Sequence, residues 1–120
     1  MYYFVREITG TEKFKCSPNS EVETYNRTIS YLVSVDHGNP DKVVKGLLAE
    51  NPNVDTVIPL RLTGKTYSER KQALIDLAIE IQAADQGGLS WNEVFILGDY
   101  FEENGKRYGC LEEFRENAIC

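Results

Sequence analysis

The amino-acid sequence predicts an α+β fold, in which a small N-terminal antiparallel β-hairpin or sheet packs against a C-terminal unit of three helices. Two observations support this fold class. Alternating β-branched and aromatic residues occur near the N-terminus, whereas apolar residues recur at helical spacing after Thr66. The helices are joined by about three to five residues, as in a compact helical unit. With 120 residues, 42% of them hydrophobic, the chain is predicted to form a single domain over 1–120.

The N-terminal region is predicted to contain two strands. Residues 2–8 and 12–16 are joined at Thr9-Gly10-Thr11, which suits a hairpin turn. Residues 21–36 have two interpretations. Helical spacing relates Val22, Tyr25, Ile29 and Leu32, whereas strand-like alternation relates Ile29, Tyr31, Val33 and Val35. The sequence favours a helix that gives way to extended chain near Ser30, with a strand as the alternative.

The middle of the chain predicts a short helix and an edge strand. Asn39 is suited to cap a helix that has Pro40 at its first position. The segment Val54–Leu62 is rich in β-formers, but Pro59 lacks the N–H group that a central strand donates to its neighbour. We therefore expect an edge strand, or one that breaks near its end.

The C-terminal half predicts three helices. Thr66 begins one of about twenty residues, because Thr66-x-x-Glu69 is a capping box. Ser90 and Glu93 form a second box, which starts a helix that should run to about Glu103 and stop at Asn104-Gly105. A last helix is expected from about Arg107. Its inward side chains would be Tyr108, Leu111, Phe114 and Ala118.

Aromatic residues are concentrated in this half. Six occur within 24 residues: Trp91, Phe95, Tyr100, Phe101, Tyr108 and Phe114. The positions of Trp91, Phe95 and Phe101 are compatible with the core face of their helix, so we expect them to be buried. Tyr100 falls nearer to the acidic side, where an exposed aromatic residue would serve as an interface anchor.

The charge distribution points to a protein partner. The net charge is −6, and residues 1–65 hold eight acids and eight bases, whereas residues 66–120 hold eleven acids and five bases. Because nucleic-acid binding needs clustered Lys and Arg, direct binding of nucleic acid is not expected. A partner with a basic surface fits better, although acidic helix faces also keep small proteins soluble. The candidate interaction residues are Asp99, Tyr100, Glu102, Glu103, Glu112, Glu113 and Glu116.

Cofactor, metal and membrane sites are not predicted. Three cysteines, Cys16, Cys110 and Cys120, lack the spacing of a zinc site or a disulfide framework, so we expect reduced thiols in or near the core. His37, the single histidine, lies in a Gly-Pro turn and is expected at the surface. Neither a signal peptide nor a transmembrane segment is evident, so the sequence predicts a cytoplasmic protein.

Gly64-Lys65-Thr66 resembles the end of a phosphate-binding P-loop, since it follows a strand and precedes a helix. The full motif requires a glycine where this chain has Pro59, whose fixed φ and missing N–H group prevent the backbone from wrapping a phosphate. The capping box also explains Thr66 without a ligand. What remains is a looser anion site made of Lys65 and the free N–H groups of the helix start.

Two functional hypotheses follow. The first is a non-enzymatic binding protein, of the kind that phages and mobile elements use as inhibitors or regulators against host defence (an anti-CRISPR, for example), which engages a basic protein surface through acidic C-terminal helices. The second is a small-ligand binder that holds a phosphate-bearing or nucleotide-like molecule at Gly64, Lys65 and Thr66. A third interpretation gives the surface charge no binding role.

Overall fold

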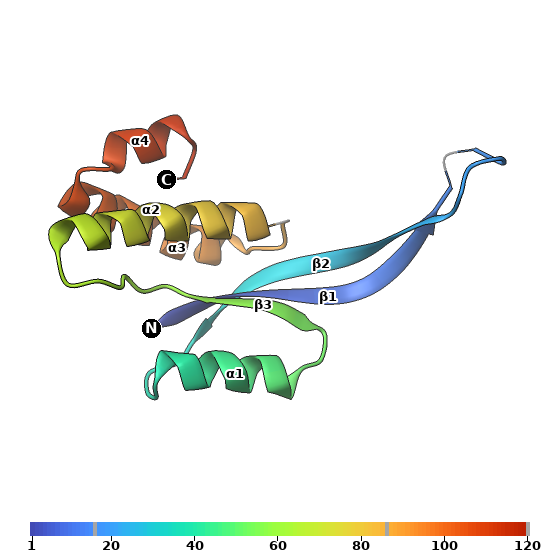
Figure 1. Ribbon diagram of the computed structural model, residues 1–120, viewed down its shortest axis with the longest axis horizontal. Helices are drawn as coiled ribbons and strands as arrows, with labels where there is room; N and C mark the ends of the chain where they lie inside the picture. The colour runs from blue at the N-terminus through green and yellow to red at the C-terminus, as the bar shows by residue number, and fades with distance from the viewer. Residues whose placement is uncertain (16, 86, 120) are drawn as a thin grey trace.

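The computed structural model describes residues 1–15, 17–85 and 87–119, and for residues 12, 14, 23 and 25 it describes the backbone. The α+β prediction is confirmed: a three-stranded antiparallel sheet of order β2-β1-β3 precedes a helical C-terminal part (Figure 1). The elements are β1 (Tyr2–Phe14), β2 (Glu23–Ser34), α1 (Pro40–Glu50), β3 (Val54–Pro59), α2 (Tyr67–Ala84), α3 (Trp91–Tyr108) and α4 (Leu111–Glu116).

The predicted hairpin at Thr9-Gly10-Thr11 is wrong. β1 continues through these residues, and the pairing of β1 with β2 shifts register between Ile8 and Gly10. A glycine inside a strand often marks an irregularity of this kind, so it is not by itself evidence of a turn. The same pairing shows that the helix predicted for the first part of 21–36 is also wrong, because β2 pairs with β1 from Phe14↔Glu23 to Tyr2↔Ser34.

β3 is an edge strand, as Pro59 indicated. It pairs with β1 from Tyr3↔Pro59 to Glu7↔Val54, and it ends at Pro59. Beyond Glu7, β1 and β2 continue together as a two-stranded arm, which extends away from the helices in Figure 1. The arm accounts for the elongated shape, with extents of 56 × 35 × 26 Å.

The helices lie on opposite sides of the strands. α1, which Asn39 caps and Pro40 begins as predicted, packs against β3, whereas α2, α3 and α4 lie on the other side in Figure 1. The main core lies between the sheet and this helical unit. Its buried side chains are Phe4, Ile58, Leu60, Leu74, Leu77, Ala78, Ile81, Ala84, Leu97, Phe101, Tyr108, Cys110 and Phe114.

The boundary between the last two helices differs from the prediction. α3 passes through Asn104-Gly105 and ends at Tyr108, and its C-cap is Gly109, whose φ of +71° is the left-handed conformation typical of a helix C-terminus. Gly105 is instead a contact point: a Cβ there would lie 3.2 Å from the Cα of Leu111. The glycine therefore lets α4 approach α3 closely, and α4 begins at Leu111 and not at Arg107.

The cysteines, the histidine and the length of the helices can be compared with the sequence predictions. Cys110 is fully buried, as expected for a reduced core thiol, and its burial raises the pKa of the thiol. Cys16 and Cys120 lie outside the described residues. His37 is exposed in its turn, as expected. Across the described ranges, every helix is too short or too polar to cross a bilayer.

Candidate functional site

The candidate anion site lies at the start of α2, where an acid of the chain itself occupies the backbone donors. Thr66 is the N-cap, and its hydroxyl accepts from the N–H of Glu69 at 3.2 Å. In return, one carboxylate oxygen of Glu69 accepts from the N–H of Lys65 at 2.7 Å and from that of Thr66 at 3.2 Å. These hydrogen bonds, from Lys65 first and Thr66 second, lower the pKa of Glu69, so its carboxylate stays charged at neutral pH.

An external anion at this site would compete with Glu69. It would need the same two N–H groups and would meet the negative charge of the carboxylate. Gly64 has its own explanation, because its φ is +112° and a Cβ there would lie 2.6 Å from the Cβ of Glu69. Helix capping thus accounts for the residues that resemble a P-loop, and phosphate binding at Gly64, Lys65 and Thr66 stays a prediction.

Three of the predicted interaction residues come together on α3. Asp99, Glu102 and Glu103 line a shallow surface hollow, with Lys106 beside them. Glu102 lies 3.5 Å from the ammonium of Lys106 and 3.9 Å from the guanidinium of Arg115 on α4. Asp99 and Glu103 are exposed. The two ion pairs of Glu102, with Lys106 and Arg115, lie near the surface, where ion pairs are weak. These carboxylates therefore remain accessible to an external cation.

The acids of α4 are less closely grouped. Glu112, Glu113 and Glu116 are all exposed. Glu113 lines a different groove of about 200 Å³, which α2 and α4 form together. Arg115 of α4 contacts the acidic cluster of α3, through its ion pair with Glu102. The predicted acidic surface thus consists of a cluster on α3 and separate acids on α4.

Tyr100 is partly buried and packs against the core. Its ring meets Phe101 edge to face, with centroids 5.4 Å apart. Burial, with a smaller contribution from the charge of Tyr108, raises the pKa of Tyr100 to about 12. The side chain is therefore held by the helical unit and keeps its hydroxyl proton at neutral pH.

The predicted burial of Trp91 and Phe95 is wrong. Their side chains are 81% and 65% exposed, whereas Phe101 is buried as expected. The buried positions of α3 are Leu97, Phe101, Gly105 and Tyr108, at steps of four, four and three residues. Trp91 and Phe95 lie at steps of four from Asp99 instead, on the outer side of the helix. This spacing can be read from the sequence. If Leu97 and Phe101 are taken as the core side of α3, it predicts that Trp91 and Phe95 are exposed.

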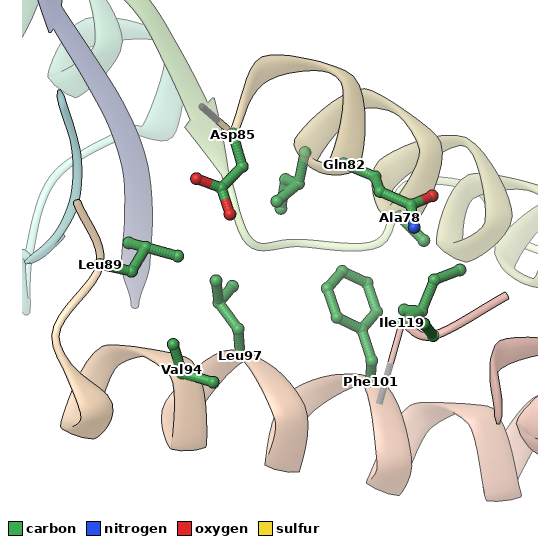
Figure 2. A pocket seen from close by; sticks show the side chains of 10 residues that line it. Ala78, Gln82, Asp85, Leu89, Val94, Leu97, Phe101 and Ile119 are labelled. Carbon is green, nitrogen blue, oxygen red and sulfur yellow. The ribbon is translucent and has the colours of Figure 1, made fainter. Parts of the chain in front are cut away.

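An apolar pocket of about 200 Å³ separates α2 from α3 (Figure 2). Its lining residues are Ala78, Ile81, Gln82, Asp85, Leu89, Val94, Leu97, Phe101, Ala118 and Ile119. In Figure 2, Leu89 and Val94 lie toward one end and Ile119 lies toward the other. The carboxylate of Asp85 accepts from the N–H of Gly87 at 2.9 Å, so this polar group is already partly satisfied. Sequence reasoning missed the pocket, because its walls come from segments that only the fold brings together.

Comparison with known proteins finds no matching family model, no matching curated protein and no matching solved structure. The outer side of α3 combines an exposed aromatic pair at its N-terminal end with the acidic cluster of Asp99, Glu102 and Glu103.

Proposed function

We propose that this chain is a non-enzymatic binding protein that engages a basic protein surface through the acidic side chains of α3 and α4. The observation that carries the proposal is the cluster of Asp99, Glu102 and Glu103 around one surface hollow. It lies in the half of the chain, residues 66–120, that holds the whole net charge of −6. Clustered charge of one sign steers an oppositely charged partner and orients it on contact.

The scaffold under the cluster suits recognition. α3 is fixed by a complete capping box at Ser90 and by the burial of Leu97 and Phe101 in the core. Because the backbone that carries these carboxylates is already ordered, binding has to order only their side chains, which favours affinity. The partner surface that contacts these carboxylates would be lined with Lys and Arg.

A surface rich in Lys and Arg is also the surface with which a protein grips nucleic acid. The biological role that fits is therefore a cytoplasmic inhibitor or regulator, such as an anti-defence protein of a phage or mobile element. Such a protein would compete with nucleic acid for the basic groove of its target.

The test begins with capture of the partner from the native host and its purification. Affinity is then measured at low and high salt for wild type and for the combined variant Glu102→Gln, Glu103→Gln, Glu112→Gln and Glu113→Gln. We expect the variant to bind about tenfold more weakly or worse at low salt, and to lose most of its salt dependence, because the removed charges are the ones that salt screens.

The matched control neutralises four exposed acids elsewhere, with Asp36→Asn, Glu50→Gln, Asp76→Asn and Glu80→Gln. The net charge changes equally in both variants, so only the position of the charge differs. The proposal is rejected if the affinity does not change with salt concentration and both variants bind like wild type. Equal losses in the two variants would reject the α3 and α4 surface and leave only a general charge effect.

A further inference from the structure

We propose that Trp91 and Phe95 anchor this chain in an apolar pocket of its partner, directly beside the basic residues that meet the acidic cluster. The docking surface is the line of Trp91, Phe95, Asp99 and Glu102 along α3, called here the α3 stripe. The inference rests on the proposed function, because the acidic half of the stripe belongs to both. It adds the aromatic half and specifies a partner surface that is both apolar and basic.

The first support is exposure. Within the described residues, Trp91 at 81% and Phe95 at 65% are the two most exposed large apolar side chains. Val94, on the same helix, is 44% exposed but lines the pocket between α2 and α3, so the aromatic pair alone marks the outer side of this helix end. Aromatic residues are enriched at the centres of protein interfaces, where a few of them carry most of the binding energy. An exposed aromatic pair at one helix end is typical of such a centre.

The second support is rigid presentation. Trp91 is the first residue of α3, directly after the N-cap Ser90. Glu93 accepts from the N–H of Ser90 at 3.0 Å, and its second oxygen accepts from the N–H of Leu32 on β2. The first turn of α3 is therefore attached to the sheet as well as to the rest of the helix. An aromatic pair held in this way requires little ordering when it binds.

The third support is alignment with the acids. Trp91, Phe95 and Asp99 follow one another at steps of four residues, with Glu102 one turn further on the same side. At 1.5 Å per residue the α3 stripe is about 16 Å long, so one partner surface can cover all of it. Its charge also selects the occupant. A second copy of the chain in a parallel arrangement would bring acids against acids. In an antiparallel arrangement the other copy's stripe would offer these acids no basic partner, whereas a basic surface neutralises them.

The experiment uses two synthetic peptides that carry the same number of lysines. One is an amphipathic leucine–lysine helix, which offers an apolar side next to its charges, and the other has serine in place of every leucine. Trp91 is the only tryptophan of the chain, so its emission reports directly on the stripe. Peptide affinity is measured independently, by polarisation of a labelled peptide, so that variants without Trp91 can be compared.

We expect the leucine–lysine peptide to bind and to shift the emission of Trp91 to shorter wavelength, because the indole leaves water. Trp91→Ala with Phe95→Ala should weaken this peptide at least about 30-fold, the range of an interface anchor. The lysine–serine peptide should bind more weakly, without an emission shift, and should be insensitive to the aromatic substitutions. The thermal midpoint of unfolding should stay within a few degrees of wild type, because both side chains are exposed.

Ile79→Ala is the matched control, since Ile79 is 57% exposed on α2, off the stripe. It should leave both affinities unchanged. If the aromatic variant binds the leucine–lysine peptide like wild type, the anchor is rejected. The proposed function still stands in that case if the combined variant Asp99→Asn, Glu102→Gln and Glu103→Gln binds both peptides more weakly than wild type. If the acid variant changes neither peptide, the proposed function fails. A wild-type dimer in sedimentation that Trp91→Ala with Phe95→Ala dissociates would overturn the proposal in favour of self-association.

Discussion

The starts of α2 and α3 share one sequence pattern and differ in what the pattern does. Each helix start is a complete capping box, preceded by a glycine of positive φ. The two segments are Gly64-Lys65-Thr66-x-x-Glu69, with a glycine φ of +112°, and Gly88-Leu89-Ser90-x-x-Glu93, with a glycine φ of +97°. At α2, one oxygen of Glu69 takes both hydrogen bonds, from Lys65 and Thr66. At α3, Glu93 uses one oxygen for the box and the other for the N–H of Leu32.

The glycines show the same contrast. A Cβ on Gly64 would meet Glu69 of its own helix at 2.6 Å, whereas a Cβ on Gly88 would lie 3.2 Å from the backbone nitrogen of Ser30. That N–H of Ser30 donates to the carbonyl of Gly87 at 3.1 Å, so the segment before α3 covers part of the edge of β2. The pattern that looked like a phosphate loop is therefore a helix start, and its second copy joins two parts of the fold.

The largest effect is expected from Glu93→Ala. It removes the capping bond and leaves the N–H of Leu32 without its acceptor, and losses of this kind total about 2 kcal/mol. Glu69→Ala should cost less, because its donors face water. Urea unfolding of both variants measures the difference, and equal losses would show that the contact with β2 contributes nothing.

The next effect is expected from Gly88→Ala, which forces a side chain into a left-handed conformation and against β2, at about 1–2 kcal/mol. Gly64→Ala should cost at least as much, but for a local reason, because its Cβ would lie 2.6 Å from the Cβ of Glu69 in the same helix start. Hydrogen exchange separates the two variants. The amides of Ser30 and Leu32 should exchange faster in Gly88→Ala and should be unchanged in Gly64→Ala. Faster exchange in both would mean that the two helix starts are coupled.

A smaller effect concerns pH. Burial raises the pKa of Glu93, but hydrogen bonds from the N–H groups of Ser90 and Leu32 and from the Ser90 hydroxyl outweigh it, so the pKa lies below the usual value of 4.5. The resulting stability is present above that value and is lost as pH falls through the lowered pKa. Glu93→Gln, which keeps the shape, should be less stable than wild type at neutral pH, by about 0.5–1 kcal/mol. The gap should close below pH 4.5 in urea titrations, and a constant gap would contradict the role of the charge.

The smallest effect is expected from phosphate at the start of α2. Because Glu69 holds the N–H groups of Lys65 and Thr66, neither pyrophosphate nor ATP should raise the thermal midpoint of the wild-type protein. A ligand at 100 times its dissociation constant would add about 2.7 kcal/mol, which a thermal shift assay detects easily. A shift that Lys65→Ala abolishes would restore the phosphate-binding hypothesis.

Local chemistry in the sequence determined the starts of the helices. Thr66 with Glu69 and Ser90 with Glu93 form their capping boxes as predicted, and Asn39 caps α1 by accepting from the N–H of Asp41. These residues could be found from the sequence because capping bonds join residues two to three positions apart. The acidic cluster of Asp99, Glu102 and Glu103 was also evident, since residues three or four apart lie together on any helix.

Long-range contacts decided the remainder. The segment 21–36 carries both a helical and an alternating pattern, and it became β2 because β1, about twenty residues earlier, offers a complete set of pairing partners. Trp91 and Phe95 are apolar enough for a core, and they are exposed because α2 and the sheet pack against the line of Leu97 and Phe101 instead. An amphipathic pattern states that a helix has an apolar side, but which apolar residues stay in water depends on where the neighbouring elements pack.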